Sequence, residues 1–249
     1  MMYKYIVGVS LLLGAFATSA ETTETWNFNT GQTAYGSSTL ALTSSEGNSA
    51  TVSGWSSAES TATSTVTHAN RLTLDSTWGA QLWNETDSGS PSHAIDNVDG
   101  FDFLLLEFTN PVNLISLTNS WVEGYSWVSV GAFESNPFAG ANDVTWQQVA
   151  NSAIQTASYE DTGVNTAFNF ANNSAIAGAG IVDTYATTWM IGTYNYLFNG
   201  SNDYTGDHIK LASIITRTEA SEPSVSVPAP TTLSLFALAL LGLCYRRRV

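Results

Sequence analysis

Cysteine is almost absent from this chain of 249 residues. The one cysteine, Cys244, lies close to the C-terminus, inside an apolar segment. A single cysteine cannot form an intramolecular disulfide, and it cannot supply the several thiolates of a structural zinc site. The fold must therefore be stabilised by its apolar core alone.

Basic residues are equally scarce between the two ends of the chain. All 21 Asp and Glu residues, but only Arg71, Lys210 and Arg217 of the 7 Lys and Arg residues, lie within Glu21–Val227. The formal charge of this segment is 3 minus 21, or −18, against −14 for the whole chain. A surface this acidic repels phosphate backbones and anionic lipids, so nucleic acid is excluded as a partner.

A long apolar run is missing as well, but the chain ends in a short one. Leu233–Tyr245 has 13 mainly apolar residues, fewer than the roughly 20 that a helix needs to cross a bilayer core. It follows Val227-Pro228-Ala229-Pro230 and precedes Arg246-Arg247-Arg248, which the positive-inside rule would hold in the cytoplasm. We expect this helix to insert transiently and the chain to be cut near the prolines, whose extended backbone is accessible to a protease.

This order of motif, short apolar helix and basic cluster resembles the bacterial PEP-CTERM sorting signal. The resemblance implies processing by an exosortase, a membrane transpeptidase. The chain has Pro228-Ala229-Pro230 where the commonest form of the signal has Pro-Glu-Pro, which implies an exosortase-like enzyme with a different preference. The alternative is an ordinary tail anchor, which would leave Cys244 and the arginines in the mature protein.

The first 20 residues indicate export. Lys4 forms a positive n-region, Ile6–Phe16 an apolar h-region, and Thr18-Ser19-Ala20 a small-residue cleavage site. A first transmembrane helix is the alternative, but the apolar run is short and polar residues follow it. We therefore expect passage through the secretion translocon, removal of a signal peptide over residues 1–20, and a mature N-terminus at Glu21.

Short segments rich in β-forming residues recur along the rest of the chain, separated by Gly, Ser and Asn. They predict an all-β domain over residues 21–218, a single antiparallel β-sandwich of jelly-roll type with one short helix. A Ser/Pro linker at 219–230 joins it to the hydrophobic segment and basic tail at 231–249. The predicted strands are Thr25–Phe28, Thr39–Thr43, Thr51–Trp55, Thr61–Thr67, Arg71–Leu74, Gln81–Trp83, Phe101–Phe108, Leu114–Trp121, Trp127–Phe133, Thr188–Tyr194 and His208–Thr216.

One segment has helical spacing instead of alternation. Asp143 could cap this helix, because an Asp side chain accepts hydrogen bonds from the first free amides of a helix. The predicted buried face carries Trp146, Val149, Ala150, Ala153 and Ile154.

Two loops that precede strands are rich in Asp and Asn. Calcium prefers six to eight oxygen ligands, and such loops supply them, which makes calcium a candidate cofactor. The spacing does not match an EF-hand loop, and Asx turns that start the following strands are the alternative. The candidate ligands are Asp96, Asn97, Asp99 and Asp102 in the first loop and Asn202, Asp203 and Asp207 in the second.

The chain has 8 tryptophans, more than a small core needs. Flat aromatic rings suit sugar faces, so Trp78 and Trp83 are candidates for contact with a surface polysaccharide, whereas Trp121 and Trp189 are expected in the core. The segment from Glu21 on has neither a Gly-x-Ser-x-Gly elbow nor a phosphate-binding glycine loop. A pool of carboxylates is the sole support for a hydrolase, and we expect the protein not to be an enzyme.

Five further segments carry a second resemblance, namely Thr25–Phe28, Ser90–Asn97, Tyr159–Gly163, Trp189–Asn195 and Asp207–Leu211. Together they resemble a family of short exosortase-dependent surface proteins of Gram-negative bacteria. The resemblance implies surface placement and carries over no catalytic residue. We therefore expect a non-catalytic protein of the cell surface or the extracellular biofilm matrix, adhesive or structural in role. The alternatives are a carbohydrate-binding module that uses calcium and a glycan-active hydrolase.

Overall fold

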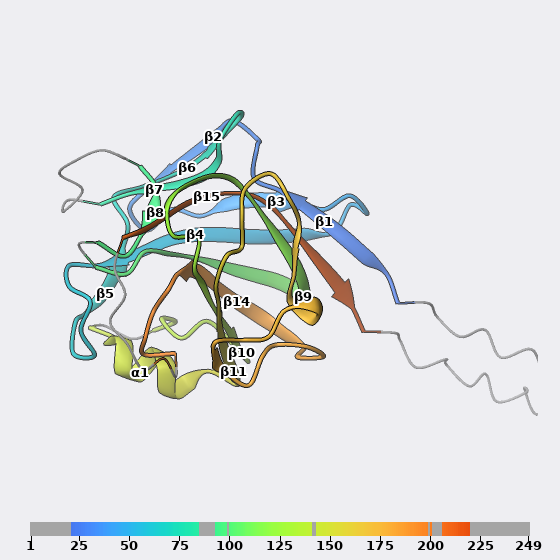
Figure 1. The fold of residues 1–249 in the computed structure, drawn as a ribbon. Coiled ribbons are helices and arrows are strands. Elements are labelled where there is room, and N and C mark those ends of the chain that lie inside the picture. The colour runs from blue at the N-terminus through green and yellow to red at the C-terminus, as the bar shows by residue number, and fades with distance from the viewer. Residues whose placement is uncertain are drawn as a thin grey trace, which may run out of the picture. The chain divides into compact units, whose positions relative to one another are not determined.

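The computed structural model describes residues 21–84, 93–98, 100–140, 143–198, 200 and 206–219. These residues form mostly β-strands with one short α-helix and one 3-10 turn, and every pairing between named strands is antiparallel (Figure 1). The predicted all-β class with a single short helix is thereby confirmed for this part of the chain. The predicted signal peptide and the C-terminal tail lie outside the described residues, among which no helix is long and apolar enough to cross a membrane.

The strands in chain order are β1 (Thr23–Asn27), β2 (Gln32–Tyr35), β3 (Leu40–Thr43), β4 (Ser49–Ser57), β5 (Val66–His68), β6 (Arg71–Asp75), β7 (Gly79–Trp83), β8 (Ile95–Asp96), β9 (Phe103–Gly124), β10 (Val128–Phe133), β11 (Gln155–Tyr159), β12 (Phe168–Asn169), β13 (Ala177–Gly178), β14 (Ala186–Thr193) and β15 (Asp207–Thr218). The helices are α1 (Trp146–Ser152) and η1 (Phe170–Asn172). The segment predicted as a strand over Thr61–Thr67 is extended only from Val66 onward, in β5.

The longest strand, β9, joins two parts of the sheet. Its first half lies between β4 and β14, and its second half pairs with β15 from Val112 to Gly124. The prediction of separate strands at Phe101–Phe108 and Leu114–Trp121 is wrong, because the chain continues through Asn110-Pro111 as one strand. Proline is tolerated there since residues 109–111 have no partner strand in the ladders with β4 and β15, so the missing N–H costs no sheet hydrogen bond.

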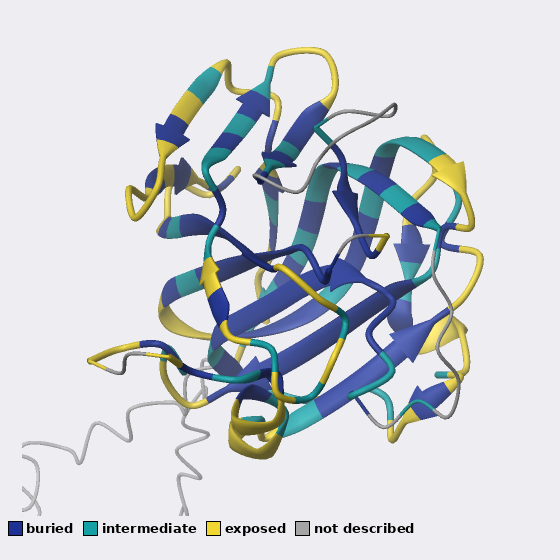
Figure 2. Ribbon diagram, turned by 90° about the vertical axis from the view of Figure 1, so that its left-hand side faces the viewer, coloured by how far each residue is buried: buried dark blue, intermediate teal, exposed yellow. Residues whose placement is uncertain are grey.

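Alternate residues of the first half of β9 enter two different cores. Leu104 and Leu106 join the main core, which gathers side chains from both parts of the sheet, including the fully buried Trp189. Phe103 and Leu105 point to the opposite face, where α1 covers them with Trp146. This double burial accounts for the apolar run Phe103–Leu106 at the start of the strand. Figure 2 shows the central strands as buried along most of their length.

The helix α1 begins two residues later than predicted. Its N-cap is Thr145, whose Oγ1 accepts from the amide of Gln148, while Gln148 Oε1 accepts from the amide of Thr145. Asp143 is instead a left-handed residue with φ of 58° and does not cap the helix. The helix ends at Ser152, so Ile154 lies beyond it and is 47% exposed, contrary to the prediction that it faces the core.

The two ends of the described domain lie side by side. β1 pairs with the last part of β15, in a register that places Thr23 opposite Arg217, and the amide of Thr218 donates to the carbonyl of Thr22. Residues 21–219 form one compact unit. The start of β1 and the end of β15 therefore emerge at the same edge of the domain (Figure 1).

Candidate functional sites

The outer face of the three strands β2, β6 and β7 carries polar and aromatic side chains. Tyr35 lies opposite Arg71 in the β2–β6 ladder, and Arg71 lies opposite Trp83 in the β6–β7 ladder. In the neighbouring row, Thr33 and Thr73 approach through their hydroxyl groups at 3.5 Å. The alternate residues of these strands, such as Leu72, are buried in the main core, so this row faces outward.

Trp83, one of the two predicted sugar-contact residues, lies on this outer face and is half-buried. The Arg71 guanidinium carbon lies 5.7 Å from the centroid of its ring, within the range of a cation–π interaction. The Nη2 atom of Arg71 also lies 3.3 Å from the ring nitrogens of His93. The Arg71 guanidinium therefore holds the Trp83 indole against the sheet and places a positive charge next to that ring.

Trp78, the other predicted residue, is 44% exposed and belongs to a second aromatic pair. Lys210 Nζ lies 5.6 Å from the Trp78 ring centroid and 5.0 Å from that of Trp121. The prediction that Trp121 belongs to the core is wrong, because its register partner is Lys210, which alternates with the buried Ile209 and Leu211 of β15. Both side chains consequently point outward.

The tight turn that carries Trp78 is held by Asp75. One carboxylate oxygen, Oδ1, accepts from the amides of Thr77 and Trp78 at 2.8 and 2.9 Å. These two hydrogen bonds lower the pKa of Asp75 below its ordinary value. Burial lowers the pKa of Lys210, and the charge of Asp75 opposes that effect.

We use the name aromatic face for the outward side of β2, β6, β7, β15 and the second half of β9. It contains two of the three basic residues of the segment Glu21–Val227, although the segment is strongly acidic. Its members are Tyr35, Trp78, Trp83 and Trp121 with the cations Arg71 and Lys210.

The two Asp-rich loops meet at Asn97 and Asp207. Asn97 is fully buried, and its Nδ2 donates to Asp207 Oδ2 at 2.9 Å and to the carbonyl of Tyr194 at 3.0 Å. Its Oδ1 accepts from the amides of Gly206 and Asp207, each at 2.9 Å. The amide side chain thus binds the loop before β9 to the start of β15.

The other described candidates in the first loop also make hydrogen bonds within the protein. Asp96 Oδ1 accepts from the amide of Val98 at 3.1 Å, which is an Asx turn. Asp102 Oδ1 accepts from Asn84 Nδ2 at 3.0 Å. Burial raises the pKa of Asp207 to about 6, and the hydrogen bonds from Asn97 and Trp127 only partly offset it.

Calcium remains a prediction for these loops. No group of three His, Cys, Asp or Glu side chains that could hold a metal ion occurs in the part of the chain that the structure describes. Three of the candidate ligands, Asp99, Asn202 and Asp203, lie outside the described residues. Asn97 and Asp207 come together as predicted candidates, but they bind each other through a hydrogen bond.

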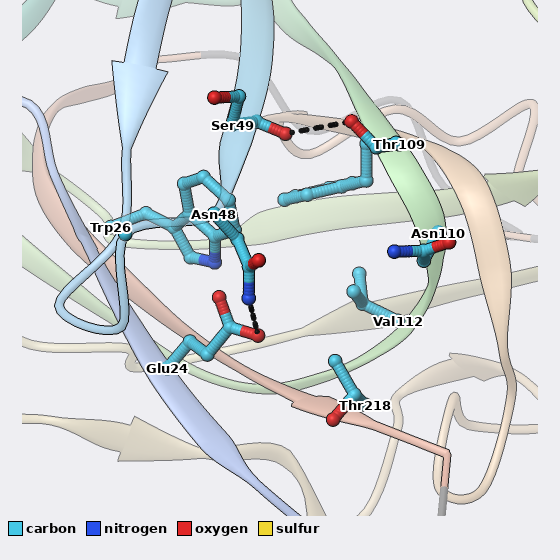
Figure 3. A pocket seen from close by; sticks show the side chains of 10 residues that line it. Glu24, Trp26, Asn48, Ser49, Thr109, Asn110, Val112 and Thr218 are labelled. Carbon is cyan, nitrogen blue, oxygen red and sulfur yellow. Dashed lines mark hydrogen bonds between the residues drawn. The ribbon is translucent and has the colours of Figure 1, made fainter. Parts of the chain in front are cut away.

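A pocket that the sequence did not indicate lies beside the segment 108–112 of β9, where the partner of this strand changes from β4 to β15. It has a volume of about 210 Å³, and its lining comes from β1, from the turn between β3 and β4, from the start of β4, from β9 and from the end of β15. Figure 3 shows the carboxylate of Glu24 hydrogen-bonded to Asn48 beside the Trp26 ring. The one signal for it in the sequence is that Glu24 stands two residues before Trp26, so a strand through both turns an acid toward the core.

A known sequence motif matches the C-terminal end of the chain. The family model for the PEP-CTERM protein-sorting motif matches residues 226–248, which include Val227, Pro228, Ala229, Pro230 and the three arginines. No curated protein and no solved structure matches the chain significantly. The motif implies export, transient membrane anchoring and processing by an exosortase. The chain thus carries a PEP-CTERM sorting motif at residues 226–248, which is consistent with processing by an exosortase.

Proposed function

We propose that the mature protein is a non-catalytic adhesive protein of the Gram-negative cell surface or extracellular matrix, built as a jelly-roll-like sandwich. The packing of both parts of the sheet around one main core supports the sandwich. The observation that carries adhesion is the aromatic face, in which Lys210 lies between the rings of Trp78 and Trp121.

The proposed binding partner of the aromatic face is a surface polysaccharide. Indole rings offer large apolar planes at low conformational cost, and sugar rings present C–H faces that pack on such planes. Gly79 and Trp83 are four positions apart on β7, which is about 13 Å along the strand, so the two indole sites can contact one extended polysaccharide chain. Thr33, Thr73 and Gln81 add hydroxyl and amide groups between them.

The hydrogen bonds around Trp78 favour polysaccharide binding over polysaccharide hydrolysis. The carboxylate beside Trp78 is Asp75, whose Oδ1 already accepts two backbone amides and whose pKa is lowered. A glycosidase needs an acid whose pKa is raised, together with a second carboxylate at a suitable distance. Asp75 is therefore unsuited to act as a general acid, and a glycan-active hydrolase is the less favoured candidate.

Sorting is tested by the intact mass of the protein from the surface of its native host and from a strain without the exosortase. We expect a chain that ends near Val227–Pro230 in the first strain only. A mass that includes Arg246–Arg248 in both strains would replace sorting by a plain tail anchor. Any added mass on the processed chain reports its attachment chemistry.

Adhesion is tested by co-sedimentation of the protein with polysaccharide from the surface of the same host. We expect Trp78→Ala to weaken binding about tenfold, since stacking of one ring contributes on the order of 1 kcal/mol or more. The matched control is Ile176→Ala, which removes an exposed apolar side chain beside β13, at the other end of the strand order from β2. Equal binding by both variants, or no binding by the parent protein, would rule out this face as the adhesive surface.

A further inference from the structure

The pocket beside residues 108–112 of β9 contains a buried carboxylate, and one of its two oxygens receives no hydrogen bond from a described residue. Glu24 is only 1% exposed, and its Oε1 accepts from Asn48 Nδ2 at 2.8 Å. Its Oε2 is buried and receives no hydrogen bond from any described residue. A buried acceptor without a donor costs free energy, so this atom is a vacant position for a hydrogen-bond donor from a ligand.

The charge of this carboxylate is also unpaired among the described residues. Among the described residues that line the pocket, none is Lys, Arg or His. The nearest strand neighbour with a cation, Arg217, is bound to Glu21 at 3.1 Å and to Asp183 at 2.8 Å. A positively charged donor would satisfy both the hydrogen-bonding and the charge requirement of Glu24, and such charge-assisted bonds are roughly twice as strong as neutral ones.

The walls of the pocket also favour a cation. Trp26 and Phe108 meet edge to face, with ring centroids 5.1 Å apart and an interplanar angle of 73°, and Val112 adds an apolar surface. Aromatic faces attract ammonium groups electrostatically when they are desolvated. An apolar body next to the charged group would pack on the same rings.

The position of the carboxylate is fixed before any ligand arrives. The turn between β3 and β4 is closed by Ser44 Oγ, which accepts from the amides of Glu46 and Asn48 at 3.2 and 3.0 Å. Asn48 in turn holds Glu24, and Thr109 Oγ1 donates to the carbonyl of Ser49 at 3.2 Å on the opposite wall (Figure 3). Such preorganisation lowers the entropic cost of binding.

We propose that this pocket binds a small primary ammonium group, which donates to Glu24 Oε2 and lies against Trp26 and Phe108. The volume of about 210 Å³ is below the range of about 300 to 1,000 Å³ typical of pockets for drug-sized molecules. A single side chain or a single sugar unit is the appropriate size. The ammonium group can therefore come from a lysine of another protein or from an amino sugar of a polysaccharide.

The test uses the full-length chain in a non-ionic detergent and four probes in calorimetric titrations. Nα-acetyl-lysine amide and glucosamine carry the ammonium group, and their N-acetylated forms are the neutral counterparts. We expect at least one ammonium probe to bind, with its neutral form about tenfold or more weaker, as expected for loss of one charge-assisted hydrogen bond. Binding of the lysine probe alone identifies a protein partner, and binding of glucosamine alone identifies an amino sugar.

The variant Glu24→Gln keeps the acceptor for Asn48 and removes the charge. We expect it to lose about tenfold or more in affinity for the ammonium probe. The control Glu46→Gln removes an exposed acid from the same turn and should bind as the parent protein does. Failure of both ammonium probes to bind, equal binding of charged and neutral probes, or parental affinity in Glu24→Gln would each overturn the proposal. If Glu24→Gln does not fold, the comparison of charged and neutral probes on the parent protein decides.

Discussion

Asn97 and Asp207 bind each other twice, although 110 positions separate them. Asn97 Nδ2 donates to Asp207 Oδ2, and the amide of Asp207 donates back to Asn97 Oδ1, both at 2.9 Å. The pair connects the loop before β9 to the first residue of β15, and both residues are buried. Hydrogen bonding of this kind provides a structural role for two residues whose types also suit calcium.

Replacement of Asn97 by Ala should destabilise the protein strongly. The change leaves the carboxylate of Asp207 and the carbonyl of Tyr194 without this donor in a buried site. We expect the free energy of unfolding to fall by about 2 to 4 kcal/mol, measured by urea unfolding with tryptophan fluorescence. The control Asn173→Ala removes an exposed amide that donates to the carbonyl of Asn169, and it should cost less than about 0.5 kcal/mol. Equal losses of unfolding free energy in the two variants would show that the buried position of Asn97 does not determine the cost of its removal.

Asp207 should make the protein more stable at acidic pH. Burial raises its pKa from 3.8 to about 6 in the folded state. Between these values the folded protein holds a proton that the unfolded chain has lost, so the free energy of unfolding falls as pH rises from about 4 to about 6. The full contribution of Asp207 to the free energy of unfolding is present below about pH 4, and its loss by about pH 6 amounts to about 3 kcal/mol.

The variant Asp207→Asn isolates this effect from the other titrating groups. It removes the ionisable group at that position, so the difference in unfolding free energy between parent and variant should change across pH 4 to 6 and stay constant above about pH 7. Urea unfolding at each pH gives this difference. A difference that is constant from pH 4 upward would mean that Asp207 has an ordinary pKa in the folded protein.

The start of α1 allows a direct comparison between a predicted and an observed cap. Thr145→Ala removes the side chain that accepts from Gln148, and we expect a loss of about 1 kcal/mol in unfolding free energy. Asp143→Asn removes the charge of the residue that the sequence favoured, while Asn still tolerates a positive φ, so its effect should stay within about 0.5 kcal/mol. Thermal and urea unfolding measure both losses. A larger loss of unfolding free energy in Asp143→Asn than in Thr145→Ala would show that Asp143 caps the helix.

The features that could be predicted are those that local sequence determines. The sorting motif is contiguous, and its order of prolines, apolar run and arginines is visible without a fold. The apolar run Phe101–Phe108 predicts a buried strand, because periodicity and composition are local properties, and β9 begins within this run at Phe103. Trp78, which the sequence analysis named as a candidate for sugar contact, is 44% exposed.

The features that were missed depend on pairing between distant segments. Trp121 points outward because its partner is Lys210, and a register between β9 and β15 cannot be read from either strand alone. The pocket around Glu24 exists because β4 leaves β9 at Phe108 and β15 joins it at Val112, and this exchange of partners is a property of the whole sheet. The continuity of β9 through Pro111 has the same origin.

Two glycines with positive φ test how tightly the loop before β9 packs. Gly100 has φ of 144°, and a Cβ added to it would lie 1.8 Å from the carbonyl oxygen of Ser57, whose Oγ accepts from the amide of Phe101. Gly163 has φ of 68°, with nothing within 4 Å of an added Cβ. Both changes to Ala incur the backbone cost of a left-handed residue, about 1 kcal/mol, but only Gly100→Ala must also displace β4.

We therefore expect Gly100→Ala to lower the free energy of unfolding by about 3 kcal/mol or more and Gly163→Ala by about 1 kcal/mol. Urea unfolding of the two variants checks the difference, and similar losses would show that the loop moves away from Ser57 at little cost.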